Sequence, residues 1–302
     1  DAHVVLGHLP ARLLGGRMAL DVGAATNAVQ RGVAEPLGLT VEEAARGILA
    51  IADNHMVGAI RVVSIERGHD PRDFTLVPFG GAGPLHGCAL ADLIGAHQVL
   101  IARAPGVLCA DGLLNADLKA EFSQALPEAM SADAAETDAL LANLEAKARE
   151  WFTVEGVAPT RQELRRVALM RYHGQGGELA VEIGEDLSAD FAAAHARLYG
   201  FALDAVVELV TLRIEATGHA AERITSDLAP NSKVTAIDEA EIIGALGRQS
   251  VSVVDRGSLG AGAVLEGPMI LSQLDTTTLI RQDWTGIVQP SGAILLTRKE
   301  KT

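Results

Sequence analysis

A glycine-rich turn between two apolar segments constrains this fold more than any other feature of the sequence. Residues 74–79 form a short apolar run, Gly80-Gly81-Ala82-Gly83-Pro84 follows it, and residues 98–102 are apolar again. Proline suits the first position of a helix and Gly95 suits a helix end, which predicts a helix from Pro84 to Ile94. Strand, turn, helix and strand in this order predict a βαβ unit with a right-handed crossover in a parallel sheet.

A long helix is predicted just before that unit. Thr40-Val41-Glu42-Glu43 is a capping box, in which Thr40 and Glu43 satisfy each other's backbone N–H groups. Arg67-Gly68 is an expected stop, so the helix has about 27 residues. Its buried face is predicted from apolar residues three or four apart, namely Val41, Ala45, Ile48, Ala52, Met56, Ala59 and Val63.

Changes of pattern along the chain predict three domains. Residues 1–125 alternate between helix and strand, residues 126–225 contain a helix and a small α+β domain, and residues 226–302 are rich in β-structure after a polar link near 226–248. The predicted elements of the second and third regions are a helix over 131–155 capped by Ser131 or Asp133, strands over 167–170, 178–183 and 208–217, a helix over 188–199, and strands over 251–254, 269–271, 277–280 and 293–296.

Composition excludes several classes of partner. The 302 residues include 25 Lys and Arg against 39 Asp and Glu, a net charge of −14, which argues against nucleic acid and anionic membranes. No apolar run approaches the roughly 18 residues of a membrane-spanning helix. Cys88 and Cys109 are expected to be packed thiols in a reducing compartment such as the cytoplasm. Because the chain begins at Asp1 and not at Met, we expect it to be part of a longer protein.

The glycine turn is also the strongest candidate for a ligand site. Glycines allow a ligand to approach the backbone closely, and the following helix offers free N–H groups and the positive end of its dipole. A tight turn without a ligand explains the same residues, and spacing alone favours it, since neither a Walker loop nor a dinucleotide fingerprint is present. His86 lies in the first turn of this helix and faces either a ligand or the protein interior.

Three other features have simpler explanations. The stretch Asp21-Val22-Gly23-Ala24-Ala25-Thr26 resembles the phosphate loop of actin-like ATPases, but no strand precedes it, so Asp21 is expected to be a helix N-cap. Residues 171–178 are polar and glycine-rich, and a wide hairpin explains them more simply than a ligand site. None of the nine histidines pairs with another ligand type at metal-site spacing, so no metal site is expected within this chain.

Several stretches together resemble the hydantoinase A/5-oxoprolinase family, whose members include N-methylhydantoinase A. The most specific one runs from Glu66 to Phe74 and continues through Phe79 to His86. The others, in the same order as in the family, are Asp1-Ala2 with Val5-Leu6-Gly7, Leu14–Met18, Pro105–Leu108, Arg171-Tyr172 with Gly174-Gln175-Gly176, Glu208–Val210, and Gly267-Pro268. The resemblance covers essentially the whole chain and corresponds to the C-terminal portion of the family.

The resemblance implies an α/β fold class, namely half of an actin/hexokinase-like ATPase fold, followed by a small α+β domain and a C-terminal all-β domain. It implies ATP-dependent ring opening of cyclic amides such as hydantoins, 5-oxoproline or lactams. The adenosine would lie at Gly80, Gly81, Ala82 and Gly83, with His86 beside it. The ligands of ATP phosphates and Mg²⁺ are expected mostly in a missing N-terminal portion of the same protein, and a hydantoinase B-type subunit is expected as a partner.

Two alternatives remain beside the cyclic-amide hydrolase. Relatives of this family are subunits of acetone and acetophenone carboxylases, which share the phosphorylating half but act on a ketone and bicarbonate. The third interpretation is a structural or assembly fragment that is inactive alone. The catalytic residues are not identified by the sequence under any of the three.

Overall fold

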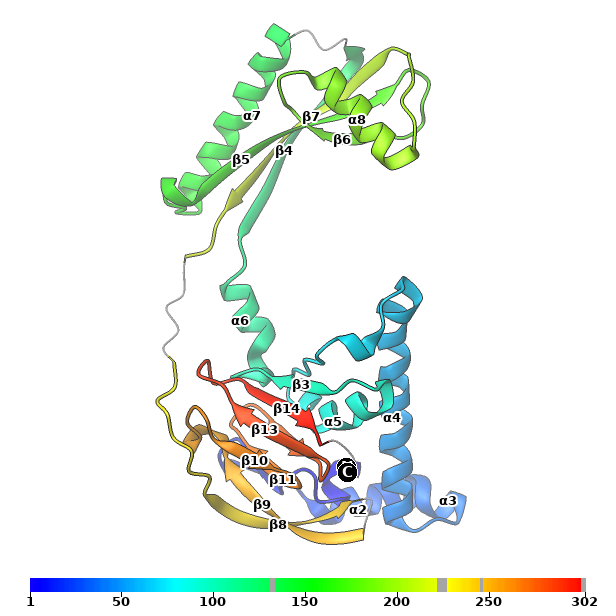
Figure 1. The fold of residues 1–302 in the computed structure, drawn as a ribbon, viewed down its shortest axis with the longest axis vertical. Helices are drawn as coiled ribbons and strands as arrows, with labels where there is room; N and C mark the ends of the chain where they lie inside the picture. The colour runs from blue at the N-terminus through cyan, green and yellow to red at the C-terminus, as the bar shows by residue number, and fades with distance from the viewer. Residues whose placement is uncertain (131–133, 222–226, 245–246, 300–302) are drawn as a thin grey trace. The chain divides into compact units, whose positions relative to one another are not determined.

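The computed structural model describes residues 1–130, 134–221, 227–244 and 247–299. The chain divides into two compact units: unit 1 is Asp1–Asp111 with Ile224–Thr302, and unit 2 is Gly112–Arg223. This division departs from the three consecutive domains expected over 1–125, 126–225 and 226–302. The β-rich C-terminal segment joins the first residues of the chain because β14 (Ile294–Arg298) pairs antiparallel with β3 (Gln98–Ile101) (Figure 1).

Unit 1 contains two four-stranded sheets. One has the order β10-β13-β14-β3, with β10 at Val264–Glu266 and β13 at Trp284–Val288. The other has the order β12-β11-β9-β8, formed by Thr277–Ile280, Met269–Ser272, Gly247–Asp255 and Ala236–Gly244. The fully buried side chains of Trp284, Ile101 and Leu265 lie in the main core of this unit. The four C-terminal strands predicted from apolar runs are all present, whereas β8 lies in the segment predicted to be a polar link.

The predicted βαβ unit is present only in part. Helix α5 (Gly83–Ile94) has proline near its start and ends at Gly95 in a left-handed conformation, as the sequence predicts. Residues 74–79 do not form a strand; Leu76 makes a single parallel bridge to Val99. Strand β3 finds its continuous partner in β14 instead, which runs antiparallel to it. Because Pro78 has no N–H group to donate, the apolar run over residues 74–79 packs against the sheet without joining it as a strand.

The predicted long helix is α4 (Val41–Val63), which a 3₁₀ turn (Ile65–Arg67) extends. Both hydrogen bonds of the capping box are formed, and Gly68 is left-handed at the end of the turn. The predicted buried face is wrong in the second half of the helix, where Ala59 and Val63 are exposed. Asp53 and Val57 are buried there instead, because the contacts of α4 with α1 and α5 set the orientation of the helix.

The segment Val41–Arg67 is long and apolar enough, by length and composition, to cross a membrane, with a mean hydropathy of 1.4 in its most apolar stretch. The sequence prediction missed this because Asp53 and Arg61 interrupt the apolar run. In unit 1 the helix contacts α1 (Ala2–Val5), α2 (Val22–Val29) and α5. Asp21 caps α2 by accepting a hydrogen bond from the N–H of Ala24 at 2.8 Å, which confirms the N-cap prediction.

The remaining N-terminal elements of unit 1 are short. Strands β1 (Arg12–Leu13) and β2 (Met18–Ala19) form a small hairpin. A π-helical turn (Gln30–Ala34) and α3 (Glu35–Leu37) follow α2. Short 3₁₀ turns occur at Pro71–Asp73, Pro105–Val107 and Arg256–Ser258, and α6 (Leu108–Leu114) leads toward unit 2.

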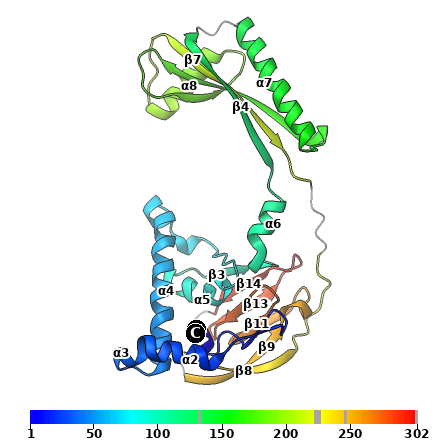
Figure 2. The ribbon, with the colours of Figure 1, turned by 180° about the vertical axis from the view of Figure 1, so that it is seen from behind.

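Unit 2 is an antiparallel sheet of order β4-β7-β5-β6, covered by two helices. Its strands are Leu118–Met130, Val207–Gly218, Gln162–Tyr172 and Leu179–Glu182, and a 3₁₀ turn lies at Pro159–Arg161. Helix α7 (Ala134–Val154) packs on β4, β5 and β7, and α8 (Leu187–Tyr199) packs on β6 (Figure 2). Phe152 of α7 and Phe191 of α8 are fully buried in one core with Leu212 and Ile214.

Most predictions for unit 2 are confirmed. The helices predicted over 131–155 and 188–199 are α7 and α8, although the proposed caps Ser131 and Asp133 lie outside the described residues. Residues 171–178 connect β5 to β6 as a hairpin, in which the Gln175 side chain accepts from the N–H of Tyr172. The strand predicted over 208–217 is β7, in which Leu212, Ile214 and Ala216 are buried in alternation, whereas a register shift beside Val210 also buries Leu209. Strand β4 was not predicted.

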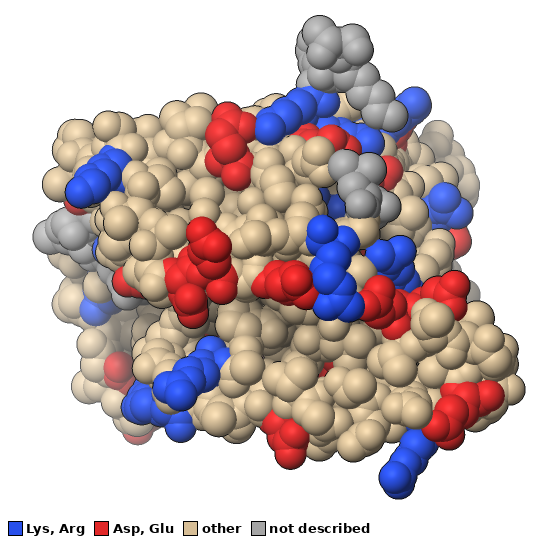
Figure 3. Space-filling model, turned by 90° about the horizontal axis from the view of Figure 1, so that it is seen from below, with Lys and Arg blue, Asp and Glu red and all other residues tan. Residues whose placement is uncertain are grey.

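Charged side chains of both signs are mixed on the face shown in Figure 3, where several basic and acidic groups touch and uncharged surface lies around them. Among the described residues, this face shows no broad basic patch of the kind that binds nucleic acid.

Candidate functional site

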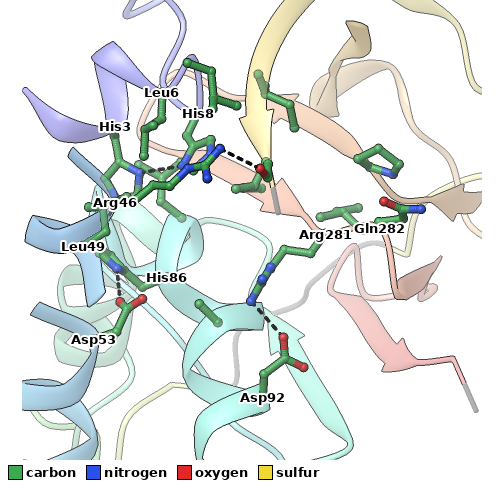
Figure 4. A pocket seen from close by; sticks show the side chains of 18 of the residues that line it. His3, Leu6, His8, Arg46, Leu49, Asp53, His86, Asp92, Arg281 and Gln282 are labelled. Atoms are coloured by element: carbon green, nitrogen blue, oxygen red, sulfur yellow. Dashed lines mark hydrogen bonds and ion pairs between the residues drawn. The ribbon is translucent and has the colours of Figure 1, made fainter. Parts of the chain in front are cut away.

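A pocket of about 440 Å³ lies within unit 1, lined by residues of α1, α4, α5, β8 and β12 and by residues following β12. Its wall combines apolar side chains such as Leu6, Leu49 and Leu85 with polar ones. Figure 4 shows that the polar groups come from several elements: His3, His8, Arg46, Asp53, His86, Asp92 and Arg281. A mostly apolar cavity with a few convergent ionisable groups is the usual form of a ligand site.

The N-terminal segment places two histidines in the pocket wall. His3 lies in α1, and the chain turns back so that the N–H of His8 donates to the carbonyl of His3 at 2.9 Å. Gly7, between them, has a φ of +71°, and a Cβ there would lie 2.0 Å from the Glu241 carbonyl oxygen in β8. The N–H of Ile243 donates to the carbonyl of Leu6 at 2.9 Å. Glycine thus allows this segment to pack directly on β8.

Helices α4 and α5 supply the other half of a hydrogen-bonded chain. His86 Nδ1 lies 2.6 Å from Asp53 Oδ1, and both side chains are largely buried, with 14% and 12% of their surface exposed. His86 Nε2 lies 3.1 Å from His3 Nε2, and His3 Nδ1 lies 3.3 Å from His8 Nδ1. Three imidazoles and one carboxylate are therefore connected end to end along the pocket wall.

Burial controls the charge of two of these rings. Desolvation, reinforced by the neighbouring His86 and His8, lowers the pKa of His3 to about 3. Desolvation also lowers the pKa of His8 to about 4, and the positive charges of Arg281 and Arg46 act in the same direction, against a hydrogen bond to the backbone of Ile243. Both rings are consequently neutral imidazoles near neutral pH, able both to donate and to accept a hydrogen bond.

Two arginines also line the pocket, and the side chain of Arg46 lies beside His3 and His8. Arg46 Nη2 donates to the carbonyl of Gly244 at 3.1 Å, and Arg281 pairs with Asp92 at 2.9 Å (Figure 4). Arg281 is balanced by this carboxylate, whereas the Arg46 contact is with a neutral carbonyl. The pocket therefore combines positive charge with the neutral rings of His3 and His8, which suits a ligand with an oxyanion or a polarised carbonyl.

Of the residues predicted from sequence, His86 lines this pocket, whereas Gly80, Gly81, Ala82 and Gly83 are not among its lining residues. The turn lies at the start of α5, with Gly80 at a φ of +84°. The N–H of Gly80 donates to the carbonyl of Pro105 at 2.7 Å, and Thr276 Oγ1 donates to the carbonyl of Gly81 at 2.9 Å. The turn is thus held firmly from both sides while Gly81 and Ala82 remain exposed.

The turn is compatible with a bound nucleotide. Ala82, the N-cap of α5, makes no side-chain cap hydrogen bond. In the first turn of the helix Pro84 has no N–H group and the N–H of Leu85 donates to the Ala82 carbonyl at 3.1 Å, so the N–H of Gly83 is the one that a ligand could accept from. A Cβ on Gly81 would meet only the Asp275 carbonyl oxygen, at 3.7 Å, so the protein itself does not require glycine there. Close approach of a ligand is one reason for glycine at such a position.

The side chains of the described residues do not offer the ligands of a Mg²⁺ site. No group of three or more His, Cys, Asp or Glu side chains that could hold a metal ion occurs within the described residues. The histidines and Asp53 of the pocket contact one another through their ligating atoms, and Asp92 is paired with Arg281. These residues do not fit a Mg²⁺ ion, which prefers several oxygen ligands.

The two cysteines behave differently. Cys88 is buried in α5, and desolvation raises the pKa of its thiol to about 12, which confirms a packed, unreactive thiol. Cys109 is exposed, so the prediction of a packed thiol there is wrong. Its position in α6, outside the core of unit 1, explains the difference.

The family model described as hydantoinase/oxoprolinase matches residues 1–122, and these include both the glycine turn and the residues of the hydrogen-bonded chain. The chain belongs to the hydantoinase/oxoprolinase family, as the sequence resemblance indicates.

Two relatives with named activities match most of the chain. The chain is 32% identical to the caprolactamase subunit alpha of Pseudomonas jessenii, over 98% of its own length and 46% of that subunit. It is 27% identical to 5-oxoprolinase 1 of Arabidopsis thaliana, over 85% of its own length and 21% of that protein. The chain therefore spans less than half the length of these relatives.

Two solved structures resemble the chain. The structure of the ATP-dependent caprolactamase of P. jessenii aligns with 99% of this chain, with a TM-score of 0.67 and 30% identity, and the alignment covers 46% of the caprolactamase chain. The structure of a nucleotide-free acetone carboxylase aligns with 99% of this chain, with a TM-score of 0.83 and 22% identity, and the alignment covers 46% of the carboxylase chain. This similarity supports the fold. The mixed α/β architecture with several sheets is thus the architecture of this family's solved members.

Proposed function

We propose that this chain is the C-terminal part of an ATP-dependent hydrolase that opens small cyclic amides. The observation that carries the proposal is the alignment of 98% of the chain with the alpha subunit of a caprolactamase, whose solved structure is described as ATP-dependent. A similarity to 5-oxoprolinase adds a second cyclic amide to the class of substrates. Caprolactam, 5-oxoproline and hydantoins share a ring amide, and the natural substrate is proposed at that level.

The chemistry explains why such a hydrolase needs ATP. An unstrained amide is a poor electrophile because its nitrogen donates electrons into the carbonyl group. When bound, ATP supplies a phosphoryl group that can be placed on the amide oxygen and makes the carbonyl carbon open to attack by water. The ring would open at that bond.

Within this chain, we propose that the turn Gly80-Gly81-Ala82-Gly83 contacts the adenosine and that His86 lies beside it. The turn's exposed backbone and the uncapped start of α5 support this assignment. Unit 1 would then be the adenosine side of an actin/hexokinase-like ATPase fold. Groups for the phosphates and Mg²⁺ would be supplied by polypeptide outside this chain, consistent with the poor fit of its own carboxylates to that ion.

Partners and location belong to the same proposal. Caprolactamase and acetone carboxylase relatives are named as subunits, which supports a hydantoinase B-type partner subunit. With a net charge of −14, we expect neither nucleic acid nor an anionic membrane among the partners. A cytoplasmic location agrees with the two free cysteines.

A carboxylase subunit is the second candidate, favoured by 29% identity over 60% of the chain to the beta subunit of an acetone carboxylase. The test is ATP hydrolysis by the complete enzyme with its partner subunit, stimulated by caprolactam, 5-oxoproline or hydantoin, against acetone or acetophenone with bicarbonate. Ring-opened product with a cyclic amide supports the proposal. ATP consumption that requires a ketone and bicarbonate overturns it in favour of the carboxylase.

A structural or assembly module is the third candidate, and ATP binding distinguishes it. The Gly81→Val variant of the complete enzyme is expected to lose at least roughly 100-fold in ATP affinity, because its side chain would occupy the space of the adenosine. Its circular dichroism should stay nearly unchanged, since only the Asp275 carbonyl lies within contact of a new Cβ. Calorimetric titration with ATP measures the affinity.

The matched control is Gly177→Val, at an exposed position of the β5–β6 loop where a Cβ meets nothing within 4 Å. It should bind ATP like the natural protein. Equal ATP affinity of the Gly81→Val variant would remove the adenosine from this turn. Absence of ATP binding by the natural complete enzyme would leave the assembly module as the better interpretation.

A further inference from the structure

The loop between β11 and β12, residues 273–276, contacts the glycine turn of residues 80–83 from far along the sequence. Thr276 Oγ1 donates to the carbonyl of Gly81, 195 positions away, at 2.9 Å, and lies 3.5 Å from the carbonyl oxygen of Gly80. Thr276 is buried, whereas Gly81 is exposed. A buried hydroxyl from a distant segment therefore supports the exposed backbone of the turn.

The neighbouring Asp275 attaches the same loop to the segment that follows β3. The N–H of Gly106 donates to Asp275 Oδ2 at 2.8 Å. A Cβ on Gly106 would lie 2.2 Å from the Asp275 carbonyl oxygen, so the two backbones are in direct contact. Pro105, next to Gly106, accepts from the N–H of Gly80 at 2.7 Å. The turn, the segment after β3 and the β11–β12 loop are therefore joined in a closed ring of contacts.

A buried arginine holds the β11–β12 loop in place. Arg256, with 7% of its surface exposed, donates to the carbonyls of Ala102 and Gly292 at 2.6 and 3.0 Å. Its other terminal nitrogen donates to Gln273 Oε1 at 3.2 Å, and the Gln273 amide donates to the carbonyl of Arg103 at 2.9 Å. A guanidinium fixes the relative positions of its acceptors, because its donors lie in one rigid plane. The loop is thus attached to residues beside β3 and β14.

The glycine turn has little else to fix its conformation. Gly80 has a φ of +84°, and Gly81 and Ala82 are exposed, so side chains of the turn itself contribute little packing. A glycine that is not held samples more backbone conformations than other residues. A ligand that must order such a turn loses affinity by the free energy of the ordering. Contacts that order the turn before a ligand arrives remove this loss.

We propose that Thr276 and Asp275 are positioning residues that hold the glycine turn in the conformation that receives a nucleotide. This inference rests on the proposed function, which assigns the adenosine to the same turn. Thr276 acts through the carbonyl of Gly81. Asp275 acts through the segment that contains Gly106, which binds the first residue of the turn. In this role neither side chain has to touch the nucleotide, and both act on its affinity.

Hydrogen exchange of the full chain tests the support of the turn without any ligand. Thr276→Val replaces the hydroxyl with a methyl group, so the N–H of Gly80 should exchange at least roughly 10-fold faster. Asp275→Ala should have the same effect. Thr276→Ser and Asp275→Asn keep an oxygen for the same contacts and should exchange like the natural chain. Thr297→Val, at an exposed position of β14, is the control and should change nothing.

Nucleotide kinetics of the complete enzyme distinguish positioning from a structural role. Thr276→Val should raise the KM for ATP about 10-fold and leave kcat at saturating ATP unchanged, since the turn would contact the adenosine and not the reacting phosphate. A variant that only weakens the fold loses active enzyme, which lowers kcat and leaves KM unchanged. Thr276→Ser should restore the natural KM. Calorimetric titration with ATP measures the same change as a dissociation constant.

Two results would overturn the positioning role. One is an unchanged exchange rate of the Gly80 N–H in both Thr276→Val and Asp275→Ala. The other is natural ATP affinity in Thr276→Val, or a loss confined to kcat. The Gly81→Val variant separates this inference from the proposed function. If it loses ATP while Thr276→Val binds normally, the adenosine site stands and the positioning role falls. If Gly81→Val binds ATP normally, both fall.

Discussion

At the scale of single residues, Gly7 determines where two of the pocket histidines lie. It stands between His3 and His8, in a left-handed conformation, against the carbonyl of Glu241. Any side chain at this position would collide with backbone, which cannot move like the end of a flexible side chain. The packing of the N-terminal segment on β8 and the positions of His3 and His8 in the pocket wall thus depend on the same residue.

The Gly7→Ala variant should lose about 2 to 4 kcal/mol of unfolding free energy, from a strained φ and from the collision with Glu241. The Gly38→Ala variant is the matched control, since Gly38 also has a positive φ but has nothing within 4 Å of a new Cβ. It should lose only about 1 to 2 kcal/mol. Urea unfolding of both variants measures the difference. Equal losses would mean that the contact with Glu241 is easily relieved.

The sequence allowed one member of the hydrogen-bonded chain in the pocket to be predicted as a candidate, and not the other three. His86 was a candidate because it follows a glycine turn at the start of a helix. His3 and His8 are 83 and 78 positions away from it, and no metal or nucleophile spacing connects them. A usable signal was present in α4, where Asp53 lies four residues after Leu49 and four before Val57. A carboxylate on the same helix face as buried apolar residues needs a hydrogen-bond donor or a positive charge inside the protein.

At the scale of secondary-structure elements, local chemistry determines where helices begin and end. Thr40 and Glu43 form both bonds of the capping box of α4, and Gly95 and Gly200 end α5 and α8 in the left-handed conformation. These boundaries could be predicted because their causes lie within a few residues. Strands β4 and β8 were not predicted, because these segments form strands through their pairing with β7 and β9, which lie elsewhere in the sequence.

The capping box leads to a prediction for α4. Thr40→Ala removes the side-chain acceptor of the Glu43 N–H and should reduce the unfolding free energy by about 1 kcal/mol. The control is Thr153→Ala on α7, where the exposed hydroxyl only bonds back to the carbonyl of Arg149 and should contribute less than about 0.5 kcal/mol. Thermal unfolding followed by circular dichroism measures both. A loss at Thr40 no larger than at Thr153 would contradict the role of the cap.

At the scale of the whole molecule, the chain leaves unit 1 after residue 111 and returns to it after unit 2. The sequence could not reveal this return, because composition changes gradually near residue 226 and the pairing of β3 with β14 joins segments almost 200 residues apart. His3 and His8, two half-buried histidines of unit 1 that are neutral near neutral pH, also make its stability depend on pH.

Below its ordinary pKa of about 6.5, each of these histidines binds a proton in the unfolded chain. In the folded protein His3 and His8 stay neutral down to about pH 3 and about pH 4. The unfolded state therefore gains protons first, and the unfolding free energy should fall as pH decreases from 6.5, by up to about 1.4 kcal/mol per pH unit for each histidine. Urea unfolding at several values between about pH 7 and about pH 5 measures this decrease in the unfolding free energy.

The double variant His3→Gln and His8→Gln should flatten this dependence, whereas His55→Gln on the exposed side of α4 should leave it intact. An unchanged slope in the double variant would assign the acid sensitivity to other groups.

The pairing of β3 with β14 also orders events during synthesis on the ribosome. Unit 2 emerges complete while β14 has still to be translated, so it can form its own core first. The edge of β3 meanwhile stays open, together with the apolar surface around Ile101 that Trp284 and Leu296 later cover. A nascent polypeptide that stalls before β14 would therefore keep this apolar surface exposed, and chaperones bind such surfaces.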